Sequence, residues 1–252
     1  MAQDKPKTVI AFDLYGTLLS TESIAKQLAE LYGDEDEAKT LAAQWRRYQL
    51  EYTWRMNSMG SYRSTYRPFS EITRAALKHA VVERKKSPLS KEDKDRLMEA
   101  YNGLQAFPDI EPAMRIVEGD DSIDAYVFSN GTDDMVGASI STCPEINQRK
   151  SRIFGPGKLV TVEGAGCFKP APATYRHFAE TVGMTGRESD IWLVSSNPFD
   201  ALGARAAGWR SAWIDRAGTG WVDALGSLID TEPTIVARGV DEALQRIAEL
   251  SK

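Results

Sequence analysis

The sequence is short of cysteine and has no long hydrophobic run. Cys143 and Cys167 are its only cysteines, and they have neither the spacing of a metal site nor the density of a disulfide scaffold. No apolar stretch follows the first residues, Met-Ala-Gln-Asp-Lys, so neither a signal peptide nor a membrane anchor is visible. These features predict a cytoplasmic protein in a reducing environment, without a membrane partner.

The chain also has no excess of positive charge. The chain has 31 Lys and Arg against 36 Asp and Glu, a formal net charge of −5, and this balance offers no basic face to a nucleic-acid backbone. We therefore expect no nucleic-acid partner. No internal repeat or low-complexity tract is present. A chain of 252 residues is long enough for one sizeable core, or for a core that carries an insertion.

The first predicted strand ends at a carboxylate. The apolar run Val9–Phe12 is typical of a buried strand, and Asp13 follows it directly, with Gly16 and Thr17 just beyond. Open α/β sheets bind ligands at the carboxyl ends of their strands, where an aspartate can act as a covalent nucleophile. The alternative interpretation is a strand that ends in an ordinary Asx-turn.

Residues 20–104 show amphipathic helical patterns and no convincing strand. The segment Ser20–Ser23 offers an N-cap for the first helix, before Ile24. A longer pattern runs over Glu37–Met56, and Ser90 begins a sequence that resembles a capping box. The block is too long to be a loop. It therefore predicts an inserted helical cap domain over residues 20–104.

Beyond the cap, predicted strands alternate with helices. The strand candidates are Ile123–Phe128, Leu159–Val162, Asp190–Val194, Ala212–Ile214 and Ile235–Ala237. Such alternation is typical of a parallel sheet joined by helical crossovers. One of these helices is expected to begin at Asp200. The predicted fold class is α/β, with a Rossmann-like, doubly wound parallel-sheet core made of residues 1–19 and 105–252.

Polar residues follow the ends of three predicted strands. Besides Asp13, these are Ser129 with Asn130, and the segment Ser195–Asp200; Lys169 lies in a turn-like stretch between them. Because the carboxyl ends of parallel strands lie along one edge, these side chains can converge on one pocket. Taken singly, a Ser-Asn-Gly is usually a turn and a Lys-Pro is usually on the surface. Their order along the chain favours a single site.

With these residues in this order, the chain resembles the haloacid dehalogenase superfamily over nearly its whole length. Asp13 and Thr17 match the nucleophile motif, Ser129 the second motif and Lys169 the lysine motif, while Ser195–Asp200 matches the acidic motif. Within the superfamily, the chain resembles the L-2-haloacid dehalogenases (type II).

Three further residues carry the resemblance to that branch. Arg46, in the predicted cap helix, matches its active-site arginine, although Arg47 beside it leaves the register open. Tyr175 matches the branch's tyrosine, and Phe199 has the aromatic position before the last carboxylate. Each has an ordinary alternative, which is a solvated helix charge for Arg46 and core packing for the two aromatic residues.

The resemblance to phosphatases of the superfamily is weaker. Those enzymes use a second aspartate as proton donor, where this chain has Tyr15, and a phenol with a pKa of about 10 is a poor donor at neutral pH. They also hold Mg²⁺ between carboxylates, and Ser195 stands where an acidic ligand is usual. Lys169 can neutralise Asp13 and Asp200 instead, so we expect no metal and no cofactor. A halide leaves as a stable anion and needs no proton donor, so a tyrosine at position 15 is compatible with a dehalogenase.

The resemblance implies a two-step hydrolysis of short (S)-2-haloalkanoic acids to (R)-2-hydroxy acids. Asp13 would attack the carbon that bears the halogen, and Asp200 would activate water to hydrolyse the resulting ester. The implied supporting catalytic residues are Thr17, Lys169, Tyr175, Ser195 and Asn197. The implied substrate-binding residues are Ser129 with the backbone N–H groups of Leu14 and Tyr15 for the carboxylate, and Arg46, Asn130 and Phe199 for the halide. A homodimer is also implied.

Two departures from the branch leave the substrate open. Pro198 stands where a small residue is more usual, and Arg55 or Asn57 in the cap helix would alter the pocket if either faced it. The alternatives are therefore a hydrolase of the same family that acts on another small substrate, such as a phosphate ester, and a catalytically silent binding protein. Retention of Asp13, Lys169 and Asp200 together argues against the silent protein.

Overall fold

The computed structural model describes residues 7–59 and 66–251, and its core is one parallel sheet. The strand order is β3-β2-β1-β4-β5-β6. The strands are β1 (Thr8–Phe12), β2 (Ile123–Ser129), β3 (Leu159–Thr161), β4 (Ile191–Ser195), β5 (Arg210–Ile214) and β6 (Ile235–Ala237). This is the predicted α/β fold. The strand order reverses between β1 and β4, and in open sheets of this kind ligands bind at that point.

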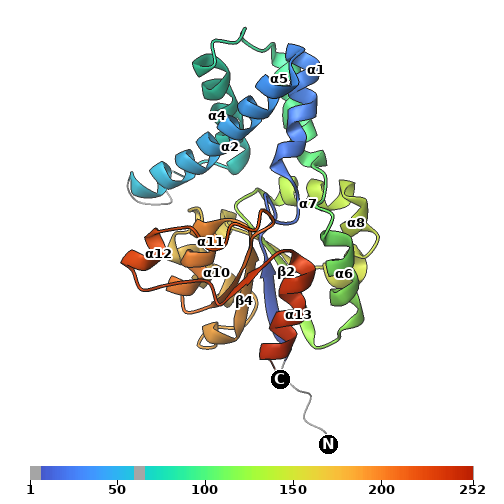
Figure 1. Cartoon of the computed structure of the whole chain (residues 1–252), viewed down its shortest axis with the longest axis vertical. Helices are drawn as coiled ribbons and strands as arrows, with labels where there is room; N and C mark the ends of the chain where they lie inside the picture. Colours follow the sequence, from blue (N-terminus) through green and yellow to red (C-terminus); the bar gives the residue numbers. More distant parts are fainter. Residues whose placement is uncertain (1–6, 60–65, 252) are drawn as a thin grey trace, which may run out of the picture.

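Helices cover both faces of the sheet (Figure 1). On one side lie α10 (Pro172–Thr181) and α11 (Pro198–Ala206), and on the other lie α6 (Ile110–Gly119) and α13 (Val240–Leu250). The central strands are therefore buried on both faces, and all five residues of β4 are buried. A strand buried in this way needs a continuous apolar run rather than an alternating pattern, and this explains the sequence of β1.

The remaining helical segments of the core are α7 (Asp133–Thr142), which has ten residues, and several short turns. The crossover from β2 to β3 holds α7, α8 (Pro144–Asn147) and α9 (Lys150–Ile153), and the other turns are η3 (Glu163–Ala165), η4 (Glu188–Asp190) and α12 (Leu225–Leu228). In the part of the chain that is described, no helix is long and apolar enough to cross a membrane.

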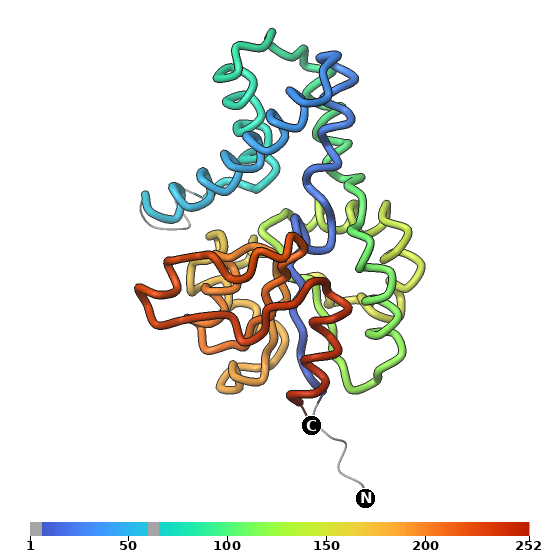
Figure 2. Tube along the Cα trace, in the orientation of Figure 1, coloured from blue at the N-terminus to red at the C-terminus, as the bar shows by residue number. Residues whose placement is uncertain are grey.

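A helical cap stands over the carboxyl ends of the strands (Figures 1 and 2). It consists of η1 (Thr21–Ile24), α1 (Ala25–Tyr32), α2 (Glu35–Ser58), α4 (Phe69–Glu83), α5 (Lys91–Ala100) and η2 (Tyr101–Gly103). The backbone N–H of Asp93 donates to the Ser90 hydroxyl at 2.9 Å, so the predicted N-cap of α5 is confirmed. Asp34, which the pattern did not indicate, caps α2 in the same way through the N–H of Glu37.

Some predicted boundaries were wrong. No side chain of Ser20–Ser23 caps a helix, because this segment leads into the 3₁₀ turn η1 and α1 follows that turn directly, with Ile24 at its N-cap. Helix α11 begins at Pro198 rather than at Asp200, since proline suits the first turn of a helix, where an N–H has no partner. Helix α2 extends two residues beyond Glu37–Met56 at each end, and β3 ends one residue early, at Thr161.

The chain crosses between core and cap twice, and the two crossings are paired with each other. Ser20 donates its backbone N–H to the carbonyl of Gln105 at 2.8 Å, and Phe107 donates to the carbonyl of Leu18 at 3.2 Å. An isolated antiparallel bridge joins residues 19 and 106. This hinge begins only a few residues after Asp13, so the nucleophile candidate lies close to where the cap is attached.

Candidate active site

Asp13 directly follows β1 and accepts hydrogen bonds from several side chains. Its Oδ2 accepts from the Thr17 hydroxyl and from Asn197 Nδ2, each at 2.7 Å, and from the Ser195 hydroxyl at 3.4 Å. Its Oδ1 accepts from Lys169 Nζ at 2.9 Å. The residue is only 6% exposed. These donors fix the direction of the Asp13 carboxylate, and nucleophilic attack requires a carboxylate held in a defined direction.

Lys169 bridges two buried carboxylates. Its Nζ lies 2.9 Å from Asp13 Oδ1, 2.6 Å from Asp200 Oδ2 and 2.9 Å from the carbonyl oxygen of Phe128, so all three ammonium protons have acceptors. The residue is 1% exposed. Burial disfavours its charge, but attraction to Asp13 and Asp200 outweighs burial, and the pKa of Lys169 lies above its ordinary value.

Asp200 and Tyr175 form the deepest part of the site. The Tyr175 hydroxyl donates to Asp200 Oδ1 at 2.7 Å, and Asp200 is fully buried. Burial raises the pKa of the Asp200 carboxyl and Asp13 adds to the rise, although Lys169 opposes it. A buried carboxylate with a raised pKa is a stronger base than a free one, which suits it to accept a proton from water.

The Tyr15 side chain is part of the packing rather than of the chemistry. Its ring stacks on Phe69 with centroids 6.1 Å apart and lies 5.5 Å from Tyr101. Its hydroxyl pairs with the Ser139 hydroxyl at 3.2 Å, and burial raises the phenol pKa well above its ordinary value. A phenol held in this way is unable to serve as a general acid near neutral pH.

The backbone of the loop after Asp13 faces the site. Among the described residues, the N–H groups of Leu14 and Tyr15 donate to no protein acceptor, whereas the Leu14 carbonyl accepts from Thr17, Leu18 and Leu19. The loop is thus fixed by its carbonyl and keeps two adjacent donors free. Two such N–H groups can bind an anionic oxygen, as predicted for the substrate carboxylate.

Arg46, rather than Arg47, reaches the core. Arg46 Nη2 donates to the Tyr15 carbonyl at 3.1 Å, within the loop that follows Asp13 (the nucleophile loop). Arg47 instead pairs with the Tyr48 hydroxyl at 3.3 Å, lies 3.9 Å from Glu83, and has a side chain that is 64% exposed. Both arginines lie on α2, so a difference of one position on the helix separates a residue at the site from one in solvent.

Ser129 and Asn130 line the site at the end of β2. The Ser129 hydroxyl oxygen accepts the N–H of Gly131 at 3.0 Å, and in the described part of the chain its own proton has no acceptor. Asn130 Oδ1 accepts the backbone N–H of Lys169 at 2.9 Å, which leaves its amide protons without a described acceptor. Both residues are buried beside Lys169 and offer donors to an anionic ligand.

The end of α2 touches the core at two places. Asn57 Nδ2 donates to the Phe168 carbonyl at 2.7 Å, and the Phe168 N–H donates to Asn57 Oδ1 at 3.0 Å. The Trp54 and Phe199 rings meet edge to face, with centroids 5.4 Å apart. Arg55 turns away, toward Glu51 at 3.2 Å. Of the two polar cap residues in question, Asn57 therefore reaches the residue before Lys169.

The residues around Asp13 do not form a typical metal shell. Within residues 7–59 and 66–251, no group of three or more His, Cys, Asp or Glu side chains is arranged to hold a metal ion. The two buried carboxylates of the site, Asp13 and Asp200, share the Lys169 ammonium.

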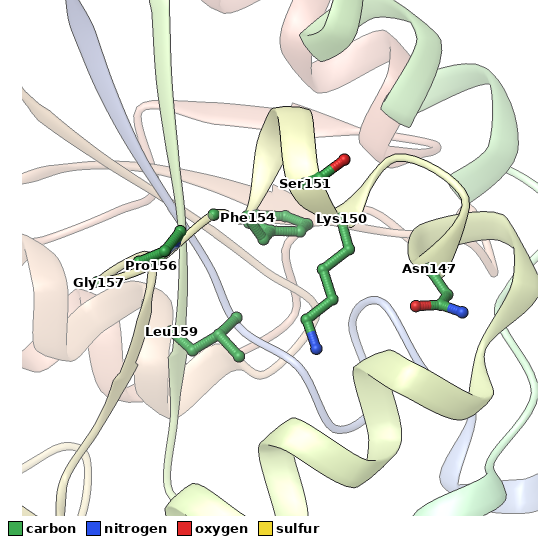
Figure 3. Close-up of a pocket in the computed structure, with 8 residues that line it drawn as sticks. Asn147, Lys150, Ser151, Phe154, Pro156, Gly157 and Leu159 are labelled. Atoms are coloured by element: carbon green, nitrogen blue, oxygen red, sulfur yellow. The ribbon is translucent and has the colours of Figure 1, made fainter.

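A hollow lies away from Asp13, at the edge of the sheet formed by β3 (Figure 3). It has a volume of about 550 Å³ and is lined by residues of α8, α9 and the segment that leads into β3. Lys150 and Phe154 are among its lining residues. None of the residues around Asp13 lines it, so it belongs to a different part of the surface.

Two contributors to the site were not predicted from the sequence. The Phe128 carbonyl, which accepts a Lys169 proton, belongs to the main chain, so its side chain gave no signal. Gly203 lies inside α11, where a Cβ would lie 2.3 Å from the Tyr175 hydroxyl. An isolated glycine within a helical pattern often has a packing reason, and that signal was available.

The fold and this constellation of residues are those of a hydrolase family. The sequence profile of the haloacid dehalogenase-like hydrolases matches residues 7–208. The chain belongs to this family.

Its relatives indicate the branch. A haloacetate dehalogenase from Moraxella sp. (strain B) is 32% identical over 222 residues, which are 88% of this chain and 91% of the relative. An (S)-2-haloacid dehalogenase from Pseudomonas putida is 31% identical, over 92% of this chain and 93% of the relative. A crystal structure of an L-2-haloacid dehalogenase superposes with a TM-score of 0.84 at 27% identity, over 97% of this chain and 100% of the other. Within the family, the chain thus belongs with the L-2-haloacid dehalogenases.

Proposed function

We propose that the protein hydrolyses short (S)-2-haloalkanoic acids to (R)-2-hydroxy acids through an ester on Asp13, without a metal ion. The observation that carries the proposal is the position of Lys169 Nζ between Asp13 and Asp200, at 2.9 and 2.6 Å. One lysine thus serves a nucleophile and a base. The names of the relatives, (S)-2-haloacid and haloacetate dehalogenases, point to the same substrates.

In the first step, Asp13 attacks the carbon that bears the halogen from the opposite side. The carbon–halogen bond breaks, and the halide leaves with its electron pair. Ser129 and the N–H groups of Leu14 and Tyr15 would hold the substrate carboxylate, because they are donors without a described acceptor. Arg46 would stabilise the halide as its charge grows in the transition state.

The departing halide would be held by three residues. Arg46 supplies a positive charge and Asn130 supplies amide protons, while Phe199 offers an apolar edge near the end of α2. A chloride or bromide ion is large and weakly hydrated, so a site with one cation and apolar neighbours suits it.

In the second step, Asp200 takes a proton from water, and the water oxygen attacks the carbonyl carbon of the Asp13 ester. The bond between the Asp13 carbonyl carbon and the substrate oxygen breaks, the departing oxygen takes the proton from Asp200, and the hydroxy acid is released with both carboxylates regenerated. The raised pKa of Asp200 favours proton transfer from water. Tyr175 orients Asp200, while Thr17, Ser195 and Asn197 return the Asp13 oxygens to their starting geometry. A single inversion at the substrate carbon explains the change from S to R.

Hydrolysis of a phosphate ester is the alternative. It would need a proton donor for the leaving alkoxide, and the buried Tyr15 phenol, bonded to Ser139, is unsuited to that task. The arrangement therefore favours a leaving group that departs as a stable anion.

One comparison separates these functions. Chloride release from (S)-2-chloropropionate is measured beside the turnover of p-nitrophenyl phosphate, each with and without Mg²⁺. We expect chloride release in both conditions and negligible phosphate ester hydrolysis. Turnover of the phosphate ester that depends on Mg²⁺ would support the phosphatase, and inactivity toward both would support the silent protein.

A second experiment tests the ester itself. Asp200→Asn removes the base but leaves Asp13 able to attack, so about one halide per site is expected in a burst, followed by a stall. Intact-mass analysis should show the carboxyalkyl adduct, and peptide mapping should place it on Asp13. Full steady-state turnover by this variant would remove Asp200 from the mechanism.

We also propose that residues 20–104 form a separate cap domain on a core of residues 1–19 and 105–252, and that the protein is a cytoplasmic homodimer. The paired hinge at residues 18–20 and 105–107 supports the boundaries. Tyr52 of α2 and His79 of α4 are partly exposed, pack against the buried Tyr48 ring and give the cap a partly aromatic face. Light scattering on the purified chain measures the oligomeric state, and a monomeric mass at micromolar concentration would exclude the dimer.

A further inference from the structure

Arg216 follows β5 and reaches toward the back of the nucleophile loop. Its Nε lies 2.8 Å from Asp109 Oδ1, and its Nη2 lies 2.8 Å from Asp109 Oδ2. The two side chains therefore form a bidentate ion pair. The same guanidinium donates from Nη2 to the Thr17 carbonyl at 2.8 Å and from Nη1 to the Ser196 hydroxyl at 2.9 Å. The central carbon of the guanidinium, Cζ, lies 3.8 Å from the centre of the Phe107 ring. One side chain thus joins three separate segments of the chain.

Two of these segments carry the reacting groups. The Thr17 hydroxyl donates to Asp13 Oδ2 at 2.7 Å and accepts the backbone N–H of Ser196 at 2.9 Å. Arg216 binds these same two residues through the Thr17 carbonyl and the Ser196 hydroxyl. A shift of the Thr17 carbonyl moves the hydroxyl of the same residue, so it would change the direction in which Asp13 is held.

The third segment provides a fixed anchor. Asp109 Oδ2 also accepts the backbone N–H of Val240, the first residue of α13, at 2.8 Å. Burial opposes the charge of Asp109, but the hydrogen bonds from Arg216 and Val240 outweigh it and lower the pKa of this carboxyl. Phe107, beneath the guanidinium, belongs to the hinge and donates to the Leu18 carbonyl at 3.2 Å. Arg216 is therefore held against the core and the hinge at once.

We propose that Arg216 is a positioning residue for the first chemical step, acting through Thr17 and Ser196 on the direction of the Asp13 carboxylate. The inference rests on the proposed function, since it assigns Asp13 as the nucleophile. Arg216 does not touch the Asp13 carboxylate in this structure. It sets the geometry of attack by fixing the nucleophile loop against the loop after β4, while its contact with Phe107 holds both loops against the hinge.

The competing explanation is a structural ion pair. The Arg216 and Asp109 side chains are only 22% and 15% exposed and pair in bidentate geometry, an arrangement in which an ion pair does contribute to stability. Loss of such a pair would lower the folded fraction without changing the rate at which a correctly folded site reacts. A test must therefore measure the rate constant of the step and the number of competent sites separately.

The experiment uses the full-length Asp200→Asn variant, which we expect to stop after halide release. With saturating (S)-2-chloropropionate, the amplitude of the chloride burst counts competent sites, and its rate constant reports attack by Asp13. Arg216→Met and Arg216→Lys are introduced into this variant. We expect amplitudes of about one per folded chain and rate constants roughly tenfold to a hundredfold lower, the scale of loss that small misplacements of reacting groups cause.

Arg187→Met is the matched control, because Arg187 forms a surface pair with Asp190 in which both side chains are 49% exposed. Its rate constant should equal that of the parent variant. An Arg216→Met burst with the parent's rate constant, whatever its amplitude, would overturn the proposal. If Arg216→Met does not fold, the burst rate constant of Arg216→Lys decides, since this variant keeps the positive charge but loses the planar, bidentate guanidinium. If the Asp200→Asn parent gives no burst, the Arg216 variants are compared by the rate constant of the first turnover in the wild-type background. A wild-type protein that releases no chloride would instead refute the proposed function, before any Arg216 variant is compared.

Discussion

Lys169 shows what a single buried charge costs and what compensates for it. The ammonium is almost completely removed from water, and its three acceptors are two carboxylates and one carbonyl. A buried ion that keeps all its partners is close to neutral for stability, whereas one that loses a partner is not. The site therefore depends on Lys169 for folding as well as for chemistry.

Lys169→Met should abolish turnover and lower the free energy of unfolding by about 3–5 kcal/mol, the usual cost of leaving a buried charge without its partner. The reason is that Asp13 and Asp200 would then face each other without a cation between them. Urea unfolding measures the stability, and Lys169→Met with Asp200→Asn is the control, because it removes one of the two charges. An equal loss in the double variant would contradict this electrostatic explanation.

The raised pKa of Lys169 predicts a pH dependence of stability. A folded-state pKa above the ordinary 10.5 adds stability that is fully present below pH 10.5 and is lost as the pH rises through the folded-state value. We expect the wild-type free energy of unfolding to fall more steeply above pH 10.5 than that of Lys169→Met. Parallel pH profiles of the two proteins would show that Lys169 does not contribute.

Arg46 and Arg47 form a matched pair of test positions. Arg46→Lys should lower kcat/KM roughly tenfold to a hundredfold, because a lysine would reach the Tyr15 carbonyl and the halide with a different geometry. Arg47→Lys should leave it unchanged within about twofold, as expected for an exposed side chain. Steady-state chloride release measures both. A larger loss for Arg47 would reverse the assignment of these two residues.

At the level of elements, much of the arrangement was predictable from local patterns. Apolar runs that end in polar residues indicated β1, β2 and β4, and the order of their polar ends indicated one site. The choice between Arg46 and Arg47 was not predictable, because it depends on the rotation of α2 about its axis against the core. The contact of Asn57 with Phe168 was also not predictable from local patterns, since it joins residues 111 positions apart in the sequence.

Gly203 links α11 to α10 through a close approach. Because a Cβ there would lie 2.3 Å from the Tyr175 hydroxyl and 2.7 Å from the Pro170 side chain, Gly203→Ala should displace Tyr175 from Asp200. We expect slower ester hydrolysis and a loss of about 1–3 kcal/mol in the free energy of unfolding, as for overpacking in a core. Gly137→Ala on α7 is the control, since its Cβ would meet nothing within 4 Å. Equal stability of the two variants would show that Tyr175 adjusts without cost.

For the whole molecule, the charge arrangement predicts activity without added metal. Chloride release from (S)-2-chloropropionate should be unchanged within about twofold after dialysis against EDTA, because Lys169 already supplies the positive charge between the two carboxylates. The comparison is made at constant ionic strength with and without Mg²⁺. A loss of activity that Mg²⁺ titration restores would contradict metal independence.

The paired hinge has a consequence for how the molecule can move. Because both crossings between core and cap lie side by side, they define a single axis, and the cap can rotate about it but can hardly slide. In a rotation, displacement grows with distance from the axis. The end of α2 lies well away from the hinge (Figure 1), so its contacts with Phe168 and Phe199 would separate first. Arg46 contacts Tyr15, which bridges to Leu19 of the hinge, so this contact would stay close. A small angular motion would therefore open a path for a small acid on one side of the molecule only.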